Sequence, residues 1–186
     1  MHRFLTCALA LCLFAAACKD DDNDIAVAAE DIVGAWQLTE YTSTSKTSGT
    51  SGGERFGAEV KIGLVSSTAV VTFAEDGTYD SRGSYTASTT TTLDGTTTDP
   101  IEQNVNVAGS AGRWEVRGGN RLVLTGASLS PDLTGGASIQ ASSAEYTITS
   151  FAADERLEIR TGIDSTFSQG GSTFRIEGDI RAVFTQ

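Results

Sequence analysis

Apolar and polar residues alternate along most of the chain after Val33, and the last segment shows this most clearly. From Phe174 to Phe184 the even-numbered positions hold Phe, Ile, Gly, Ile, Ala and Phe, whereas positions 175, 177, 179 and 181 hold Arg, Glu, Asp and Arg. Successive side chains of a strand point to opposite faces, so this pattern predicts a strand with one buried and one solvated face. The same alternation occurs at 60–64, 69–73, 114–116, 122–124, 146–148 and 157–159. No apolar repeat at helical spacing is sustained along the chain.

Glycine-containing turns separate these segments. Asp76-Gly77 and Asp94-Gly95 are favoured two-residue hairpin loops, and Gly118-Gly119-Asn120 and Gly170-Gly171 separate later strands. We count about ten strands joined mostly by hairpins, and a twisted sheet of that size tends to curl or close on itself. The sequence therefore predicts an all-β fold, an antiparallel up-and-down meander of about 8–10 strands that closes into a barrel or forms a curled sandwich.

Two stretches lack the alternation. Ser43 to Gly53 contains no apolar residue, and Ser128 to Ser138 contains Pro131 and two glycines. Both stretches are rich in turn-forming residues, so we expect two mobile loops. Before the first strand, Ala26 to Asp31 allows one helical turn.

The first residues predict a segment that is removed from the mature protein. Met1-His2-Arg3 carries one fixed positive charge, and the apolar run from Phe4 to Ala17 is interrupted only by Thr6. The run is shorter than the roughly 20 apolar residues that a membrane-spanning helix needs. These are the marks of a secretory signal peptide. We therefore divide the chain into a signal peptide (1–17), Cys18 with an acidic tether (18–31) and a β domain (32–186).

Cys18 is the candidate for lipid attachment. The small residues Ala15-Ala16-Ala17 precede it, which resembles the lipobox of bacterial lipoproteins, and the resemblance implies a lipidated Cys18 that anchors the protein in a membrane. The alternative is an ordinary signal peptide in which Cys18 stays unmodified. The following Lys19-Asp20-Asp21 resembles the surface-export signal of Bacteroidota lipoproteins, which implies a protein anchored in the outer membrane and facing the cell exterior. A solvated acidic spacer is the other interpretation of these charges.

Removal of the signal peptide would leave few residues for nucleophilic or metal chemistry. The sequence has one histidine, one methionine and three cysteines, and all of these except Cys18 lie within residues 1–17. The net charge would change from −11 to −12, because Arg3 is the only charged residue removed. Without imidazole, neither Ser-His-Asp nor Cys-His catalysis is available, and zinc lacks its usual ligands. No internal disulfide can form, so the domain must depend on its hydrophobic core, for which about 155 residues suffice.

Carboxylates are the remaining catalytic groups, since a glycosidase needs only two of them. The acidic residues lie in turns or alternate with arginine, as in Arg113-Trp114-Glu115-Val116-Arg117, which is typical of a solvated strand face. We therefore expect no enzymatic activity, no metal and no cofactor. An acidic chain with scattered arginines has no basic stripe, so we expect no nucleic-acid partner. We also expect a monomer.

A family resemblance extends over nearly the whole β domain. Val33-Gly34-Ala35-Trp36-Gln37-Leu38 is similar to the opening strand of the lipocalin-like domains of Bacteroidota lipoproteins, and similar segments follow in order: Val71 to Tyr79, Gly112 to Val116, Asn120 to Leu124 and Tyr146 to Phe151. The resemblance implies a lipocalin-like barrel that is open at one end, with Trp36 packed across the closed end. In lipocalins an arginine near the last strand covers this tryptophan. Arg181 is the candidate here, but its parity places it on the outer face.

Two functions fit these features. The first is binding of a small apolar or amphipathic ligand inside the barrel, for which Tyr79 and Tyr85, with small residues between them, and Trp114 are the candidate contacts. The same tyrosines could instead fill the core, with Gly83 marking a bend. The alternative function is that of a structural or accessory cell-surface lipoprotein that contacts proteins or glycans and holds no internal ligand.

Overall fold

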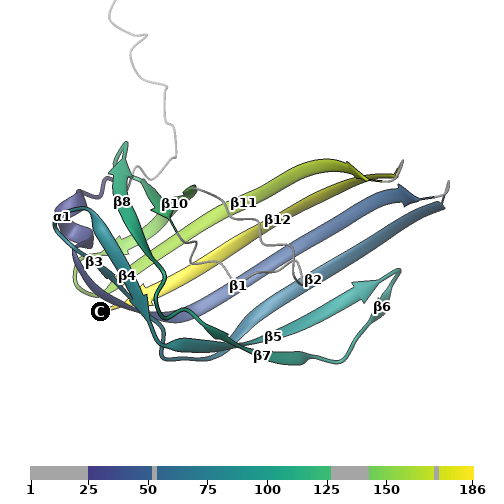
Figure 1. Ribbon diagram of the computed structural model, residues 1–186, viewed down its shortest axis with the longest axis horizontal. Coiled ribbons are helices and arrows are strands. Elements are labelled where there is room, and N and C mark those ends of the chain that lie inside the picture. The colour runs from purple at the N-terminus through teal and green to yellow at the C-terminus, as the bar shows by residue number, and fades with distance from the viewer. Residues whose placement is uncertain (1–24, 52–53, 127–142, 170–171) are drawn as a thin grey trace, which may run out of the picture.

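The computed structural model describes residues 25–51, 54–126, 143–169 and 172–186. Cys18, the predicted signal peptide, the expected loop from Ser128 to Ser138 and the Gly170-Gly171 turn lie outside the described residues. Within them the chain forms one short helix and twelve strands (Figure 1): α1 (Ala29–Ile32), β1 (Gly34–Ser51), β2 (Glu54–Ser67), β3 (Val70–Phe73), β4 (Thr78–Arg82), β5 (Ser84–Leu93), β6 (Thr96–Thr97), β7 (Ile101–Asn106), β8 (Ala111–Arg117), β9 (Arg121–Gly126), β10 (Ser143–Ala152), β11 (Arg156–Gln169) and β12 (Ser172–Thr185).

Eight of these strands close a barrel. Antiparallel neighbours follow in the order β1, β12, β11, β10, β9, β8, β4 and β3, and β3 pairs again with β1. This closure confirms the predicted all-β antiparallel meander and makes it a barrel rather than a curled sandwich. The Asp76-Gly77 turn joins β3 to β4, and the Gly118-Gly119-Asn120 turn joins β8 to β9, as the sequence predicts.

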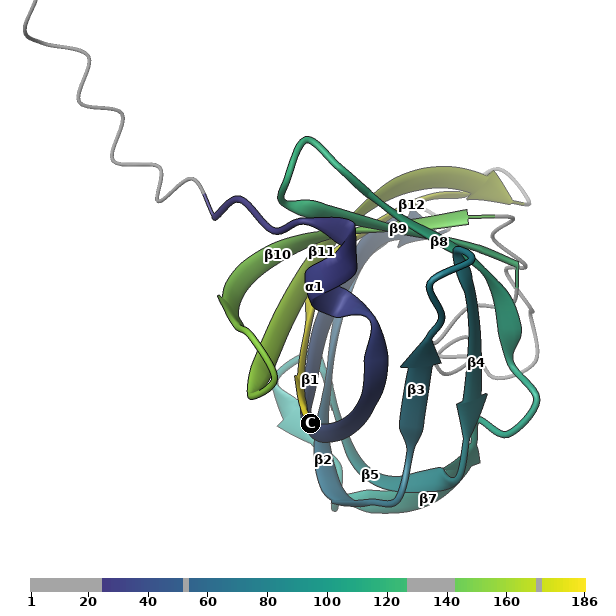
Figure 2. The ribbon, with the colours of Figure 1, turned by 90° about the vertical axis from the view of Figure 1, so that its left-hand side faces the viewer.

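Part of the sheet continues beyond the barrel. Residues 42–51 of β1 pair with β2, β2 pairs with β5, and β5 pairs with β6 and β7. We call this part the extension: β2, β5, β6, β7 and the ends of β1, β11 and β12 that run beside them. Figures 1 and 2 show that it is curved and projects from one end of the barrel.

One expectation from the sequence is wrong. The sequence predicts a mobile loop from Ser43 to Gly53, but the residues up to Ser51 belong to β1, and residues 52–53 lie outside the described part. The stretch is ordered because β12 and β2 supply backbone hydrogen-bond partners along its two edges. A strand that is paired along both edges does not need large apolar side chains of its own to be ordered.

The opposite end of the barrel is covered by the segment before β1. Val27 and Ile32 are buried, and the Val27 amide donates a hydrogen bond to the carbonyl of Gly119 at 2.6 Å. Trp36 is fully buried, and its indole N–H donates to the Ile32 carbonyl at 2.7 Å. Figure 2 shows α1 lying across this end. The segment from Val27 to Ile32 is therefore part of the packed core.

An ion-pair network lies on the outer face of β1, β11 and β12. Both carboxylate oxygens of Glu158, whose side chain is only 9% exposed, accept hydrogen bonds from Arg181 at 2.9 Å. Arg156 and Arg160 also donate to Glu158, and Arg181 reaches Glu40 at 2.7 Å. The hydrogen bonds from Arg181 are the main reason why the pKa of Glu158 falls to about 2. Arg181 thus lies on the outer face, as its parity predicts, and binds Glu158 rather than covering Trp36.

We expect Glu158→Gln to make stability less dependent on pH. The folded pKa of about 2 lies below the ordinary value of 4.5, so the charged form stabilises the fold above about pH 4.5 and this contribution is lost as the pH falls towards 2. The variant should therefore lose about 2 kcal/mol of unfolding free energy at pH 7, and the difference from the wild type should shrink in acid. Urea denaturation at several pH values measures both effects. Glu155→Gln, in the exposed turn before β11, is the control, and a difference that stays constant down to pH 2 would contradict the assignment.

Candidate functional site

An apolar cavity lies inside the barrel near the end from which the extension projects. Strands on opposite sides of the barrel line it, with Leu38, Tyr41, Tyr85, Tyr146, Ile180 and Phe184 among the lining residues. The space open to the centre of a water molecule is about 40 Å³, which is room for about three waters. No charged side chain of the described residues lines it. The cavity is therefore small, apolar and suited to a slender molecule rather than to a bulky ring system.

Tyr85 supplies a polar group to this cavity. It is the second residue of β5, just after the bend at Gly83. It is 3% exposed, and its ring lies 5.9 Å from that of Tyr41. Among the described residues its hydroxyl has no hydrogen-bond partner. Burial, with a smaller contribution from Tyr41, raises the pKa of Tyr85 far above its usual value, so the hydroxyl stays protonated and can donate. A buried hydroxyl without a partner costs free energy, which a ligand oxygen would recover.

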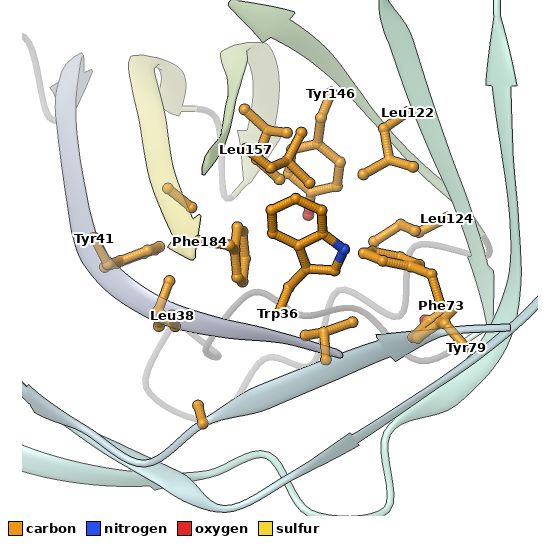
Figure 3. Close-up of a cluster of buried hydrophobic side chains, with 14 of the residues drawn as sticks. Trp36, Leu38, Tyr41, Phe73, Tyr79, Leu122, Leu124, Tyr146, Leu157 and Phe184 are labelled. Atoms are coloured by element: carbon orange, nitrogen blue, oxygen red, sulfur yellow. The ribbon is translucent and has the colours of Figure 1, made fainter. Parts of the chain in front are cut away.

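The other two candidate residues lie outside the cavity lining. Tyr79 and Trp114 are buried and pack against Phe73, with ring centroids 6.4 and 5.3 Å away. The indole of Trp114 donates to the Ala74 carbonyl at 3.1 Å. Figure 3 shows Phe73 and Tyr79 on one side of Trp36 and Leu38, Tyr41 and Phe184 on the other. Of the three candidates, only Tyr85 faces the cavity, and ligand contact by any of them stays a prediction.

Sequence reasoning missed Tyr41 because a bulge changes the parity of its strand. The register of β1 against β12 shifts between Leu38 and Glu40. Trp36 and Leu38 point inwards at even positions, whereas Tyr41 and Ser43 are the buried residues after the bulge. An uninterrupted alternation would therefore have placed Tyr41 on the outer face. Tyr146 was recognised as an inward residue of its strand, but nothing in the sequence placed it beside Tyr41 and Tyr85.

The described part of the chain has neither a metal-binding cluster nor a membrane-spanning helix. No three residues of the types His, Cys, Asp and Glu converge there to hold a metal ion. No helix among the described residues is long and apolar enough to cross a membrane.

The fold and the cavity together define a closed antiparallel β-barrel that fits a lipocalin-like fold and encloses a small apolar cavity. The chain belongs to the family described as domain of unknown function DUF5004, whose model matches residues 14–155. No curated protein and no solved structure matches the chain.

Proposed function

We propose that this protein is a lipid-anchored lipoprotein of the outer membrane that binds a small, uncharged amphiphile in its barrel and catalyses no reaction. The observation that carries the proposal is the hydroxyl of Tyr85, which is buried without a hydrogen-bond partner among the described residues in a mainly apolar cavity. A ligand with one oxygen atom and an apolar body would complement both features.

The ligand oxygen should be uncharged. No lysine or arginine lines the cavity among the described residues, and the whole chain is acidic, with a net charge of −11. A carboxylate or phosphate would lose its hydration there without gaining a cation. An alcohol, aldehyde or ester oxygen needs only a neutral donor, which Tyr85 provides.

The carboxyl groups whose pKa values are clearly shifted do not have the shift that a general acid needs. The pKa of Glu59 is lowered by Lys61, that of Asp76 by Thr78 and that of Glu158 by Arg181. A general acid that works near neutral pH requires the opposite shift, a raised carboxyl pKa.

Anchoring at Cys18 agrees with the placement of Ile25, the first described residue. Ile25 is the seventh residue after Cys18, so a fully extended chain between them spans at most about 25 Å. The segment after Ile25 packs at the α1 end of the barrel, as Figure 2 shows. A lipid on Cys18 would therefore hold this end near the membrane.

Tyr85→Phe tests the binding proposal with two effects of opposite sign. Removal of the partnerless hydroxyl should raise the unfolding free energy of the empty protein by about 1 kcal/mol. The same change should weaken binding of octan-1-ol roughly tenfold, because the ligand loses its hydrogen-bond donor. Residues 19–186 contain every described strand and core residue and can be used for denaturation and calorimetry. Tyr79→Phe, outside the cavity lining, is the control and should leave affinity unchanged; equal affinities for wild type and Tyr85→Phe would contradict the proposal.

The anchor is tested with the full chain in a bacterial host. Cys18→Ser should move the protein from the membrane fraction to the soluble or unprocessed fraction, because the thiol that accepts the lipid is gone. Mass spectrometry of the processed N-terminus reports the lipid directly. A wild-type protein cleaved before an unmodified Cys18 would contradict the anchor and would favour an ordinary signal peptide.

A further inference from the structure

The inner face of the extension carries three parallel rows of side chains that lead away from the cavity. The central row belongs to β1 and consists of small residues: Ser43, Ser45, Thr47 and Gly49. Each pairs across to a residue of β2 on one side, in the order Ile62, Val60, Ala58 and Phe56. Each also pairs to a residue of β12 on the other side, in the order Ile180, Gly178, Ile176 and Phe174. We call these twelve residues the inner strip.

The inner strip has a low centre between two mainly apolar borders. Neighbouring strands lie about 4.8 Å apart, so the two borders are separated by about 10 Å with only small side chains between them. Gly178 brings β12 close to β1, because a Cβ there would lie 2.2 Å from the Thr44 carbonyl oxygen. This shape suits one slender chain that lies along the strand direction.

The two ends of the inner strip differ. At the far end, the rings of Phe56 and Phe174 lie 5.5 Å apart, and a Cβ on Gly49 would lie 2.8 Å from Phe56 Cζ. The aromatic pair therefore closes the strip over Gly49. At the other end the strip joins the cavity, because Ile180 belongs to both, and Tyr41, the next inward residue of β1, lines the cavity.

The described elements leave most of the inner strip only partly covered. The strands of the extension contact their neighbours within the sheet, and the apolar residues of the strip beyond Ile62 and Ile180 are only partly buried. The cavity alone is too small for a whole amphiphile of ordinary length. The apolar part of a ligand whose oxygen binds Tyr85 must therefore extend beyond the cavity. The inner strip is an apolar surface that adjoins the cavity.

We propose that the inner strip binds the straight hydrocarbon chain of the amphiphile whose oxygen is held by Tyr85, which identifies the ligand class as a long-chain alcohol or ester. This inference rests on the proposed function. From Ser43 to Gly49 the strip is about 20 Å long at the rise of a β-strand. The hydrocarbon core of a bilayer, two acyl chains thick, measures about 30 Å, so the strip accommodates one chain of membrane-lipid length.

The test compares octan-1-ol with hexadecan-1-ol, delivered from cyclodextrin, on residues 19–186. The wild type should bind hexadecan-1-ol at least roughly 100-fold more tightly, because each additional buried methylene strengthens binding severalfold. Thr47→Phe fills the strip and should abolish most of this preference while leaving octan-1-ol affinity unchanged, since the shorter chain ends before Thr47. Ser48→Phe changes the next residue of β1, which is exposed on the outer face, and should behave as the wild type.

The outcomes separate this inference from the proposed function. If both alcohols bind equally and Tyr85→Phe weakens both, the cavity is a ligand site and the assignment of the strip is wrong. If neither alcohol binds, both the proposed function and the assignment of the strip are wrong. The protein could also form a dimer that Thr47→Phe disrupts and that hexadecan-1-ol does not dissociate. This result would assign the strip to a second copy of the chain and overturn the inference. Thr47→Leu, a smaller change with the same expected direction, replaces Thr47→Phe if circular dichroism shows that the latter is misfolded.

Discussion

Trp36→Ala should lower the free energy of unfolding by about 3–5 kcal/mol, the largest effect that we expect of any single substitution. Trp36 has no exposed surface and is the largest of the fully buried side chains among the described residues. Its ring lies 6.3 Å from that of Phe151, and its N–H satisfies the carbonyl of Ile32 at the end of α1. Alanine would leave a cavity and an unpaired carbonyl at the covered end of the barrel.

Urea denaturation of residues 19–186 measures this loss. The matched control is Gln37→Ala, the next residue of β1, which is exposed and should change stability by less than about 0.5 kcal/mol. Similar losses for the two variants would show that the segment before β1 does not pack on the barrel as described. Trp36→Phe should lie between the two, since it keeps most of the apolar volume but not the hydrogen bond.

Gly83→Ala should cost about 3 kcal/mol or more, whereas Gly95→Ala should cost about 1–2 kcal/mol. The two glycines have nearly the same backbone conformation, with φ of +86° and +85°. A Cβ on Gly83 would lie 2.2 Å from the Thr68 carbonyl oxygen, whereas a Cβ on Gly95 would meet nothing within 4 Å. The pair therefore separates the strain of a left-handed conformation from the cost of a backbone clash.

Gly83 matters for the site as well as for stability. It forms the bend between β4 and β5, and its carbonyl accepts a hydrogen bond from Val107 at 3.1 Å. Tyr85 follows two residues later, so a displaced bend should also weaken octan-1-ol binding in Gly83→Ala but not in Gly95→Ala. Thermal unfolding and calorimetry on both variants test this, and equal losses of stability would contradict the close approach of Thr68.

The sequence was sufficient to predict the fold class because the alternation of side chains is a local property of each strand. The turns at Asp76-Gly77 and Asp94-Gly95 also depend on local chemistry, and the structure confirms both. The bend at Gly83, which the sequence offered with the alternative of a filled core, is also present. The outward position of Arg181 followed from the same parity. Each of these predictions needed only the residues within one strand or one turn.

Features that depend on neighbouring strands could not be predicted in this way. The stretch from Ser43 looked like a loop because its own residues are small and polar, yet β2 and β12 order it from both sides. The bulge after Leu38 reversed the parity that would have revealed Tyr41. The cavity arises from side chains of several strands that are distant in sequence, so no local pattern marks its position or the missing partner of Tyr85.

The claim at the centre of this account is that the barrel captures an apolar molecule. Native mass spectrometry of residues 19–186, purified from a bacterial host without detergent and compared before and after solvent extraction, tests it most directly. We predict a reproducible additional mass that extraction removes and that a long-chain alcohol restores. A clean mass of the empty protein, with no uptake from a panel of fatty alcohols, sterols and pigments, would contradict the claim and would favour an accessory lipoprotein that acts through its outer face.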